Sequence, residues 1–318
     1  MSDISIIIPL YNKEKFIKKT IESVLNQSFN NFELIVINDG STDKGLSLVK
    51  DIKDKRIRTY TIKNSGVSRA RNYGINKAKY DLIAFLDGDD LWKKNHLQEV
   101  HKLYLRHPNC GLYAMGYNKI FNNGKAFRAK VFGLDNFSGI IDDFFLSSLA
   151  DCVAWSSAVM IPKRTFAKVG YFNEDMRSGQ DTELWIRIAL KFDISYNSKI
   201  TTSKIIFFNE NHLSNSLYKI DRLKIFKQFK LKEAKNPSLK TFLDLNRFSI
   251  AIERKQKGDI NNYIKLRNSI CKNNLNLKQK ILLKLPSNIL ILLRKIQIIL
   301  LKVNIYITPF KYYPKIRL

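Results

Sequence analysis

The first ninety residues alternate between continuous apolar runs and segments whose apolar residues recur every three or four positions. The first pattern is typical of buried strands and the second of helices with one buried face. Strands are predicted at 4–8, 32–37, 57–62 and 82–86, and helices at 15–26, 44–52 and 67–78. Pro9 closes the first strand, and Ser41 and Thr42 are predicted caps of the helix at 44–52. This order predicts an α/β fold with a mostly parallel sheet and helices on both faces.

Further along, the pattern is less regular. Helices are predicted at 94–105, 165–169 and 181–191, and strands at 111–121, 127–132 and 155–161. Beyond residue 218 the chain is predicted to form helices that break at Asn236-Pro237, Gly258 and Pro286. We therefore expect a domain over 1–218, with halves 1–92 and 93–218, and then a helical region over 219–318.

Four loops of small and polar residues follow the predicted strands of the first half. They cover 9–12, 39–43, 64–66 and 87–90, and a parallel sheet brings them to one edge, where ligands bind. The last loop holds Asp87, Asp89 and Asp90, three carboxylates in four residues. Like charges so placed need a cation, and a divalent metal that bridges a diphosphate is one interpretation. A solvated acidic turn is the other.

Charge is spread unevenly along the 318 residues. The formal net charge is +27, and residues 219–318 carry 24 Lys and Arg against 5 Asp and Glu, a net of +19. A basic region of this kind indicates nucleic acid or an anionic membrane surface as a partner. The three cysteines, Cys110, Cys152 and Cys271, are far apart and lack metal spacing, which favours a reducing compartment. Since no leader or membrane-spanning run is recognised, we expect a cytoplasmic protein, free or peripheral on the inner face of the membrane.

Several ordered motifs together resemble the family 2 glycosyltransferases of the GT-A (Rossmann-like) fold. They are Ile6-Ile7-Ile8-Pro9-Leu10-Tyr11-Asn12, Val36-Ile37-Asn38-Asp39-Gly40-Ser41-Thr42-Asp43, Asn64-Ser65-Gly66-Val67-Ser68-Arg69-Ala70-Arg71-Asn72 and Phe85-Leu86-Asp87-Gly88-Asp89-Asp90. Gly170-Tyr171-Phe172-Asn173-Glu174 and Gly179-Gln180-Asp181-Thr182-Glu183-Leu184-Trp185 resemble the acceptor-side half of that family. The likeness covers about residues 4–215.

The resemblance assigns the loops after the first three strands to a nucleotide, usually one with uracil. Tyr11 would stack on the base and Asp39 would accept its imide N–H. Pro9 and Asn12 would shape the same loop, and Asn64 and Gly66 belong to the site as well. A surface aromatic at Tyr11 and a turn former at Asp39 are the structural alternatives.

The acidic loop resembles the Asp-x-Asp motif of the family. Asp89 would ligate Mn²⁺ or Mg²⁺, and Asp87 would reach the ribose or the water shell of the metal. Asp90 is either a third carboxylate of the site or a helix cap. Arg71 falls in the Ala-Arg-Asn triplet of the family and is either a phosphate contact or one half of a scaffolding salt bridge.

Asp181 is the expected catalytic base, with Glu183 as the fallback and a plain helix N-cap as the structural alternative. The family usually has Glu-Asp at this point, where this chain has Gln180-Asp181. One base and one displacement imply inversion at the anomeric carbon. His212 is a weaker expectation as a metal ligand, and Asn209 competes for the same place.

Trp155, Ser156 and Trp185 are assigned either to the acceptor side or to the core. In the tail, seven apolar residues fall on one helical face: Ile289, Leu292, Leu293, Ile296, Leu300, Val303 and Ile307. Two interpretations stand for this face, an interfacial helix on anionic lipid and a bundle or homo-oligomer contact. Nucleic acid is not expected, because no stacking platform or nucleic-acid motif accompanies the charge.

These patterns lead us to expect a metal-dependent inverting glycosyltransferase of the hexosyltransferase type. It would move a sugar from a nucleoside diphosphate, UDP for preference, to a hydroxyl of a cell-surface glycan or a lipid-linked oligosaccharide. Two alternatives remain, a polyprenyl-phosphate glycosyltransferase and a non-catalytic subunit that binds nucleotide sugar or acts as a scaffold.

Overall fold

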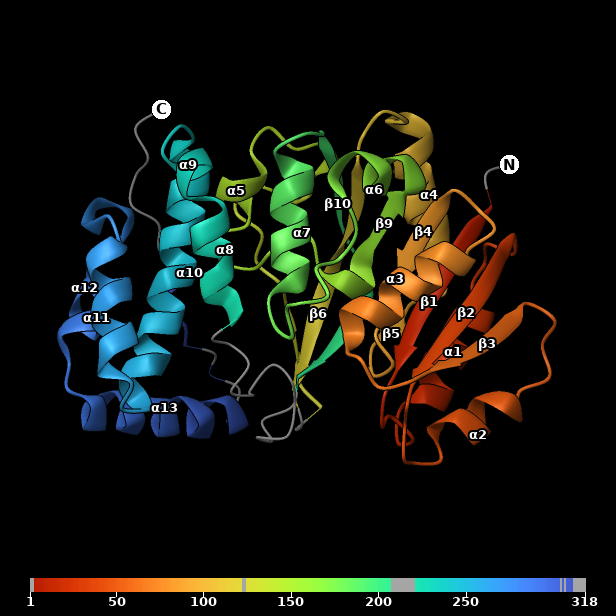
Figure 1. The fold of residues 1–318 in the computed structure, drawn as a ribbon, viewed down its shortest axis with the longest axis horizontal. Helices are drawn as coiled ribbons and strands as arrows, with labels where there is room; N and C mark the ends of the chain where they lie inside the picture. The colour runs from red at the N-terminus through yellow and green to blue at the C-terminus, as the bar shows by residue number, and fades with distance from the viewer. Residues whose placement is uncertain (1–2, 122–123, 207–220, 304, 306, 311–318) are drawn as a thin grey trace. The chain divides into compact units, whose positions relative to one another are not determined.

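The computed structural model describes residues 3–121, 124–206, 221–303, 305 and 307–310 (Figure 1). The chain divides into two compact units. The first comprises Met1–Phe144 and Cys152–Ile225, and the second comprises Phe145–Asp151 and Phe226–Leu318. The domain boundary predicted after residue 218 lies outside the described residues.

The first unit opens with the predicted parallel strands. They are β1 (Ile4–Leu10), β2 (Phe32–Asp39), β3 (Ile57–Ile62) and β4 (Leu82–Phe85), in the spatial order β3-β2-β1-β4. The helices between them are α1 (Ile17–Leu25), α2 (Gly45–Lys50) and α3 (Val67–Lys77). β1 continues one residue past Pro9, which is tolerated because β4 pairs with β1 only as far as Ile7. All four loops thus leave the sheet at one edge.

Beyond β4 the sheet becomes mixed. β9 (Val159–Pro162) runs antiparallel between β4 and β6 (Leu112–Phe121), and β10 (Ile194–Ile206) runs parallel to β6. The remaining strands are the short β5 (Leu91–Trp92), β7 (Ala126–Arg128) and β8 (Ser138–Ile140). The helices of this part are α4 (His96–Arg106), α6 (Lys163–Val169) and α7 (Gln180–Ala189), whereas α5 (Phe144–Ser147) belongs to the second unit from Phe145 on.

The strands predicted in this part need two corrections. The one predicted at 127–132 shrinks to β7, which pairs only with β6 at the rim of the sheet. The one predicted at 155–161 begins instead with a 3₁₀ turn at Ser156–Ala158.

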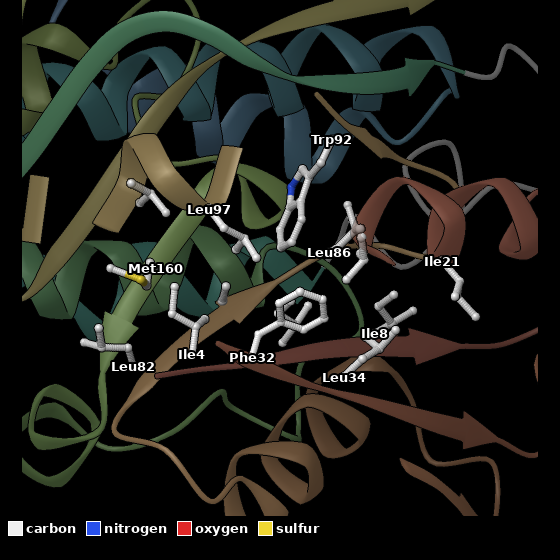
Figure 2. Close-up of a cluster of buried hydrophobic side chains, with 14 of the residues drawn as sticks. Ile4, Ile8, Ile21, Phe32, Leu34, Leu82, Leu86, Trp92, Leu97 and Met160 are labelled. Carbon is white, nitrogen blue, oxygen red and sulfur yellow. The ribbon is translucent and has the colours of Figure 1, made fainter. Parts of the chain in front are cut away.

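The main core lies on the face of the sheet covered by α1, α2 and α4. Alternate residues of the central strands, such as Ile4, Ile8 and Leu34, meet Ile21 of α1 and Leu97 of α4 (Figure 2). The intervening residues face the other side, where Ile7 lies against Gly74 of α3 and the Phe85 ring meets Phe166 of α6. Burial on both faces explains why the strands are continuously apolar.

The second unit is helical. It contains the second half of α8 (Leu223–Gln228), and then α9 (Lys230–Glu233), α10 (Pro237–Gln256), α11 (Ile260–Ser269), a 3₁₀ turn at Lys272–Asn274, α12 (Leu277–Lys284) and α13 (Ser287–Lys302). The predicted breaks are confirmed. The Asn236 side chain caps α10 through the Leu239 amide, Gly258 follows α10 with a φ of 77°, and Pro286 separates α12 from α13. Within the described residues, no helix is both long and apolar enough to cross a membrane.

Candidate active site

Asp39, the last residue of β2, holds the loop that follows β3. Its Oδ1 accepts the Ser65 amide at 2.8 Å and its Oδ2 accepts the Gly66 amide at 2.9 Å. Burial raises the pKa of Asp39, and these two hydrogen bonds offset part of that rise. The residue is therefore more than a turn former. Each carboxylate oxygen has a further lone pair, so a base N–H can still be accepted.

Glycine lets the loops after β2 and β3 approach closely. Gly40 has a φ of 69°, and a Cβ at this position would lie 2.9 Å from the Asn64 amide nitrogen. Gly66 has a φ of 93° with open space where a Cβ would lie, so there the backbone conformation alone favours glycine. Asn64 itself is exposed at this edge.

The loop after β1 is joined to the loop after β2. The Asn12 amide donates to Ser41 Oγ at 3.2 Å, and Asn12 Oδ1 accepts the Thr42 amide at 2.9 Å. Ser41 and Thr42 were predicted as caps of α2, and this prediction was wrong. The Asp43 side chain accepts the Gly45 amide at the start of α2 instead. Beside these contacts Tyr11 is 45% exposed, so its ring is open to a planar ligand.

Two of the three carboxylates after β4 each pair with a different cation. Asp87 Oδ1 lies 2.5 Å from Arg71 Nη2, and Asp89 forms an ion pair with the ammonium of Lys13. The Asp89 side chain is 9% exposed and that of Asp87 24%. The expectation that this acidic loop needs cations is thus met by the chain's own Arg71 and Lys13.

Lys13 lies at this edge beside Asp89, a contact that the sequence analysis did not predict. A signal was present, because Lys13 follows Asn12 in a loop predicted to share an edge with the acidic residues. Its aliphatic stem also lies next to Gly88, where a Cβ would come within 3.4 Å of Lys13 Cγ. Lysine was overlooked because a solvated surface position was the ordinary expectation.

Arg71 forms a salt bridge, which is one of the two roles that the sequence left open, and its role as a phosphate contact stays a prediction. It is 3% exposed, pairs with Asp87, and lies with its guanidinium carbon 5.2 Å from the centre of the Phe172 ring. Its Nε and Nη1 are buried and have no hydrogen-bond partner among the described residues. Unsatisfied buried donors are costly, and an anion such as phosphate would satisfy them.

Asp90 anchors the end of β4 to the segment before β9. Its Oδ2 accepts Ser157 Oγ at 2.6 Å and Trp155 Nε1 at 2.9 Å, and the side chain is fully buried. Burial, with the nearby charges of Asp89 and Asp87, raises the pKa of Asp90 to about 7. The helix-cap alternative was wrong, since Asn95 precedes α4. Ser157, which the sequence analysis did not single out, is a serine that contacts the acidic loop, and its neighbour Ser156 is buried.

The oxygens at this edge suit a hard divalent cation. Mg²⁺ and Mn²⁺ are commonly held by one or two carboxylates together with substrate phosphates, which Asp87 and Asp89 fit. No three His, Cys, Asp or Glu side chains are grouped to hold an ion in the part of the chain that the structure describes. A metal would therefore need substrate oxygens in its shell and would compete with Lys13 for Asp89. His212 and Asn209 lie outside the described residues.

Asp181 lies in the first turn of α7, where the helix dipole favours a negative charge. It is partly exposed, and its Oδ1 accepts the Thr182 amide at 2.7 Å. The plain N-cap alternative was wrong, because Gly179 precedes the helix. Within the described residues no hydrogen bond or ion pair joins Asp181 to the loops above, so its catalytic role stays a prediction.

Glu183, the fallback base, is occupied by an ion pair. It is 1% exposed, and its two oxygens accept Arg187 Nε and Nη2, each at 2.7 Å. Arg187 also donates to the carbonyl oxygens of Gly170 and Tyr171. The pair therefore secures α7 to the loop that follows α6 and leaves Asp181 as the more accessible carboxylate.

Asn72 connects the two halves of the first unit. Its side chain donates to the Phe172 carbonyl and to Glu174 Oε1, both at 2.9 Å, and accepts the Phe172 amide at 3.0 Å. Trp185, 1% exposed and 6.1 Å from the Phe172 ring, belongs to the core. The Asn72 contacts place the 172–174 segment beside α3, next to Arg71.

Comparison with known sequences matches this part of the chain to one family. Residues 5–162 match the model of glycosyl transferase family 2. An uncharacterized glycosyltransferase of Rickettsia bellii is 38% identical over 224 residues, which are 68% of this chain and 31% of that protein. A Bacillus subtilis protein named as a teichuronic acid biosynthesis glycosyltransferase, TuaG, is 27% identical over 67% of this chain and 82% of its own. The chain spans about a third of the first curated relatives it matches.

Solved structures show the same fold. The crystal structure of Staphylococcus aureus TarS aligns with a TM-score of 0.65 at 19% identity, over 86% of this chain and 50% of TarS. Its residues 1–349, in complex with UDP-GlcNAc, align with a TM-score of 0.58 over 84% of this chain and 91% of that one. At this identity the likeness concerns the fold alone, which is of the GT-A type. With the family match and the motif residues gathered at one sheet edge, the chain belongs to glycosyltransferase family 2.

Proposed function

We propose that this chain is a metal-dependent inverting glycosyltransferase that uses a UDP-sugar. The observation that carries the proposal is the sheet edge formed by Asp39, Asp87 and Asp89. Beside it, Arg71 has two buried donors that find no partner in the described part of the chain. Such an edge supplies oxygens for a cation and N–H groups for an anion. A nucleoside diphosphate bound through a divalent ion needs both.

A uridine nucleotide suits the loops after β1 and β2. Tyr11 offers an exposed ring for stacking, and Asp39 has lone pairs left for the imide N–H of uracil. The fold neighbour TarS was crystallised with UDP-GlcNAc, which supports a UDP-sugar as the donor here.

In the transfer reaction the metal and Asp181 would have separate roles. A bound Mn²⁺ or Mg²⁺ would neutralise the charge that develops on the leaving diphosphate. Arg71 would donate its Nε and Nη1 hydrogens to the phosphate oxygens. Asp181 would accept the proton of the acceptor hydroxyl as that oxygen attacks the anomeric carbon, so the configuration there would invert.

For the acceptor we propose a hydroxyl of a cell-surface glycan or of a lipid-linked oligosaccharide. The support is the printed name of TuaG, which concerns teichuronic acid biosynthesis. Such an acceptor would place the chain at the cytoplasmic face of a membrane, as a peripheral protein.

The decisive experiment is UDP release from a panel of UDP-sugars, with Mn²⁺ or with EDTA. Wild type is compared with Asp89→Ala and with a matched control, Asp51→Ala, which removes an exposed carboxylate after α2. We expect release from one sugar that needs the metal, is lost in Asp89→Ala and is kept in Asp51→Ala.

Two results would count against the proposal. Absence of UDP binding with and without metal would reject the nucleotide site. Metal-dependent UDP binding without release, also when membrane lipid extract is supplied as an acceptor source, would favour the non-catalytic subunit.

A further inference from the structure

The helix α13 exposes an apolar stripe along most of its length. Leu290 is its one large apolar residue buried below 9% in the part of α13 with described side chains. Six others are between 37% and 60% exposed: Ile289, Ile291, Leu292, Leu293, Ile296 and Ile299. At 100° per residue all of these except Ile291 fall within about a third of the helix circumference, and we call these five the outer stripe. Isolated exposed apolar residues are ordinary, but a continuous stripe marks an interaction surface.

Contacts at both ends hold α13 against the rest of the second unit. At its start, Ser287 Oγ donates to the Lys255 carbonyl at 2.9 Å, and Gln256 Nε2 donates to the Leu290 carbonyl at 3.0 Å. After α13 the chain returns, so that Gln297 Nε2 donates to the Ile307 carbonyl at 2.6 Å. Figure 1 shows α13 crossing the end of α10 rather than packing along it. The outer stripe is thus presented by an ordered helix.

The C-terminal part of the chain, which includes α13, carries charged side chains of one sign only. The last acidic residue of the chain is Asp259, and residues 260–318 contain 12 Lys and Arg and no Asp or Glu. Arg294 and Lys295, both exposed, lie between residues of the stripe in sequence and outside it on the helix. A surface that complements this one must be anionic as well as able to receive apolar side chains.

We propose that α13 is an interfacial helix that binds the surface of an anionic bilayer. The outer stripe would enter the boundary between headgroups and acyl chains, and Arg294 and Lys295 would lie among the headgroup phosphates. α13 is too short and its stripe too one-sided to span the bilayer, which is consistent with binding in the plane of the surface. The proposal concerns the second unit and does not depend on the transfer reaction.

A second copy of the chain fits this surface less well. Paired α13 helices would bring Lys295 and Arg294 of both copies together without any acidic side chain in residues 260–318 to balance them. Lipid phosphates balance this charge, and the bilayer interior receives the stripe without requiring a shaped partner.

Vesicle flotation of the full chain tests the proposal. Vesicles of phosphatidylcholine with about one-third phosphatidylglycerol are compared with phosphatidylcholine alone. We expect wild type to bind the anionic vesicles at least tenfold more strongly, with binding that weakens as salt is added. The variant Leu292→Gln/Ile296→Gln/Ile299→Gln should lose at least tenfold in affinity, and Arg294→Gln/Lys295→Gln about 25-fold.

Matched controls remove the same kinds of side chain elsewhere. Leu105→Gln/Leu231→Gln/Leu277→Gln removes three exposed leucines outside α13, and Lys50→Gln/Lys53→Gln removes two exposed lysines of the first unit. Both should bind vesicles as wild type does. UDP binding and thermal melting, measured for every variant, identify any that fail to fold.

Three outcomes would overturn the proposal. These are no binding to anionic vesicles, binding that the stripe variant leaves unchanged, and self-association that the stripe variant abolishes while vesicle binding is absent. The last outcome would assign the stripe to a second copy of the chain.

Discussion

Two buried clusters of charge in this chain use the same residue types and leave different groups unpaired. On α10, Asp244 is completely buried and accepts Lys240, Arg247, Asn274 and the Cys271 amide. Arg247 in turn forms a bidentate ion pair with Glu233. After β4, by contrast, Arg71 pairs with Asp87 and has two donors left over.

The difference separates a structural ion network from one that suits a ligand. A network whose donors and acceptors satisfy one another has nothing to offer a ligand, and removal of one member leaves buried charge behind. After β4, Asp87 is partly exposed and pairs with Arg71, and substrate groups can replace this partner. Both places combine acidic and basic side chains, so the exposure of Asp87 and the donors of Arg71 without partners among the described residues are the distinguishing features.

Asp89→Ala should give the largest effect and sharpen the comparison most. We expect the rate of metal-dependent UDP release to fall by about 10³-fold, because the metal would supply several kcal/mol of stabilisation to the charge on the leaving diphosphate. The free energy of unfolding in urea should change by less than about 1 kcal/mol, since Lys13 is partly exposed and can be solvated. A large decrease in the free energy of unfolding would instead show that Asp89 belongs to a structural ion network.

Asp244→Ala should do the reverse. It leaves Lys240 and Arg247 without their shared carboxylate, which we expect to cost about 3–5 kcal/mol in the free energy of unfolding of the second unit. Folded protein should bind UDP as wild type does. The control Asp259→Ala removes the cap of α11 and should cost only about 1 kcal/mol. An Asp244→Ala variant of unchanged stability would break the comparison.

His96 is a buried titratable group whose pKa is shifted by burial. It is fully buried against Thr201, and burial lowers its pKa from 6.5 to about 3. Below pH 6.5 the unfolded chain therefore gains a proton that the folded chain does not. His96 alone should therefore lower the free energy of unfolding by about 1.4 kcal/mol per pH unit as the pH drops from 6.5 towards 3. Asp90, whose pKa is raised to about 7, contributes a slope of the opposite sign over part of this range.

Urea unfolding of wild type and His96→Gln at several pH values isolates this contribution, because Asp90 and the other carboxylates are common to both proteins. The difference in stability between the two proteins should change by about 1.4 kcal/mol per pH unit below pH 6.5, and His107→Gln, at a half-buried position, should not show this change. A difference that stays constant with pH for His96→Gln would contradict the prediction.

Lys13→Met should give the smallest effect and address the competition for Asp89. Without the ammonium, we expect Mn²⁺ to bind the nucleotide-free protein about fivefold more tightly, since a partly exposed pair is worth about 1 kcal/mol. Titration followed by the electron paramagnetic resonance of free Mn²⁺ measures the affinity. Lys15→Met, at an exposed position of the same loop, is the matched control. Equal affinity in all three proteins would show that Lys13 and the metal do not compete.

The parallel half of the fold was predictable because its strands are buried on both faces. The continuous apolar runs at β1 and β2 and the acidic loop after β4 placed the edge of the sheet correctly. The hydrophobic pattern did not predict β10, because the fully buried positions of this strand include the polar residues Ser195, Thr201 and Thr202. Polar residues that are satisfied inside a sheet resemble loop residues in sequence.

Side-chain partners in the site were harder to predict than its position. The sequence indicated that the acidic residues share an edge with the loop after β1, yet it did not indicate that Lys13 reaches Asp89. It likewise offered two roles for Arg71 and two for Asp90, and only the surrounding contacts select between them. Long side chains have many rotamers, and their choice depends on neighbours that are distant in sequence.

The place of β9 in the sheet has a consequence for synthesis of the chain on the ribosome. β4 is complete at residue 85, but its neighbour β9 is not made until residues 159–162. During the intervening 73 residues β4 remains an open edge with apolar side chains, the kind of edge that pairs with other nascent chains. Translation that stalls within this interval should therefore yield fragments that aggregate or need a chaperone, whereas arrest after β9 should not.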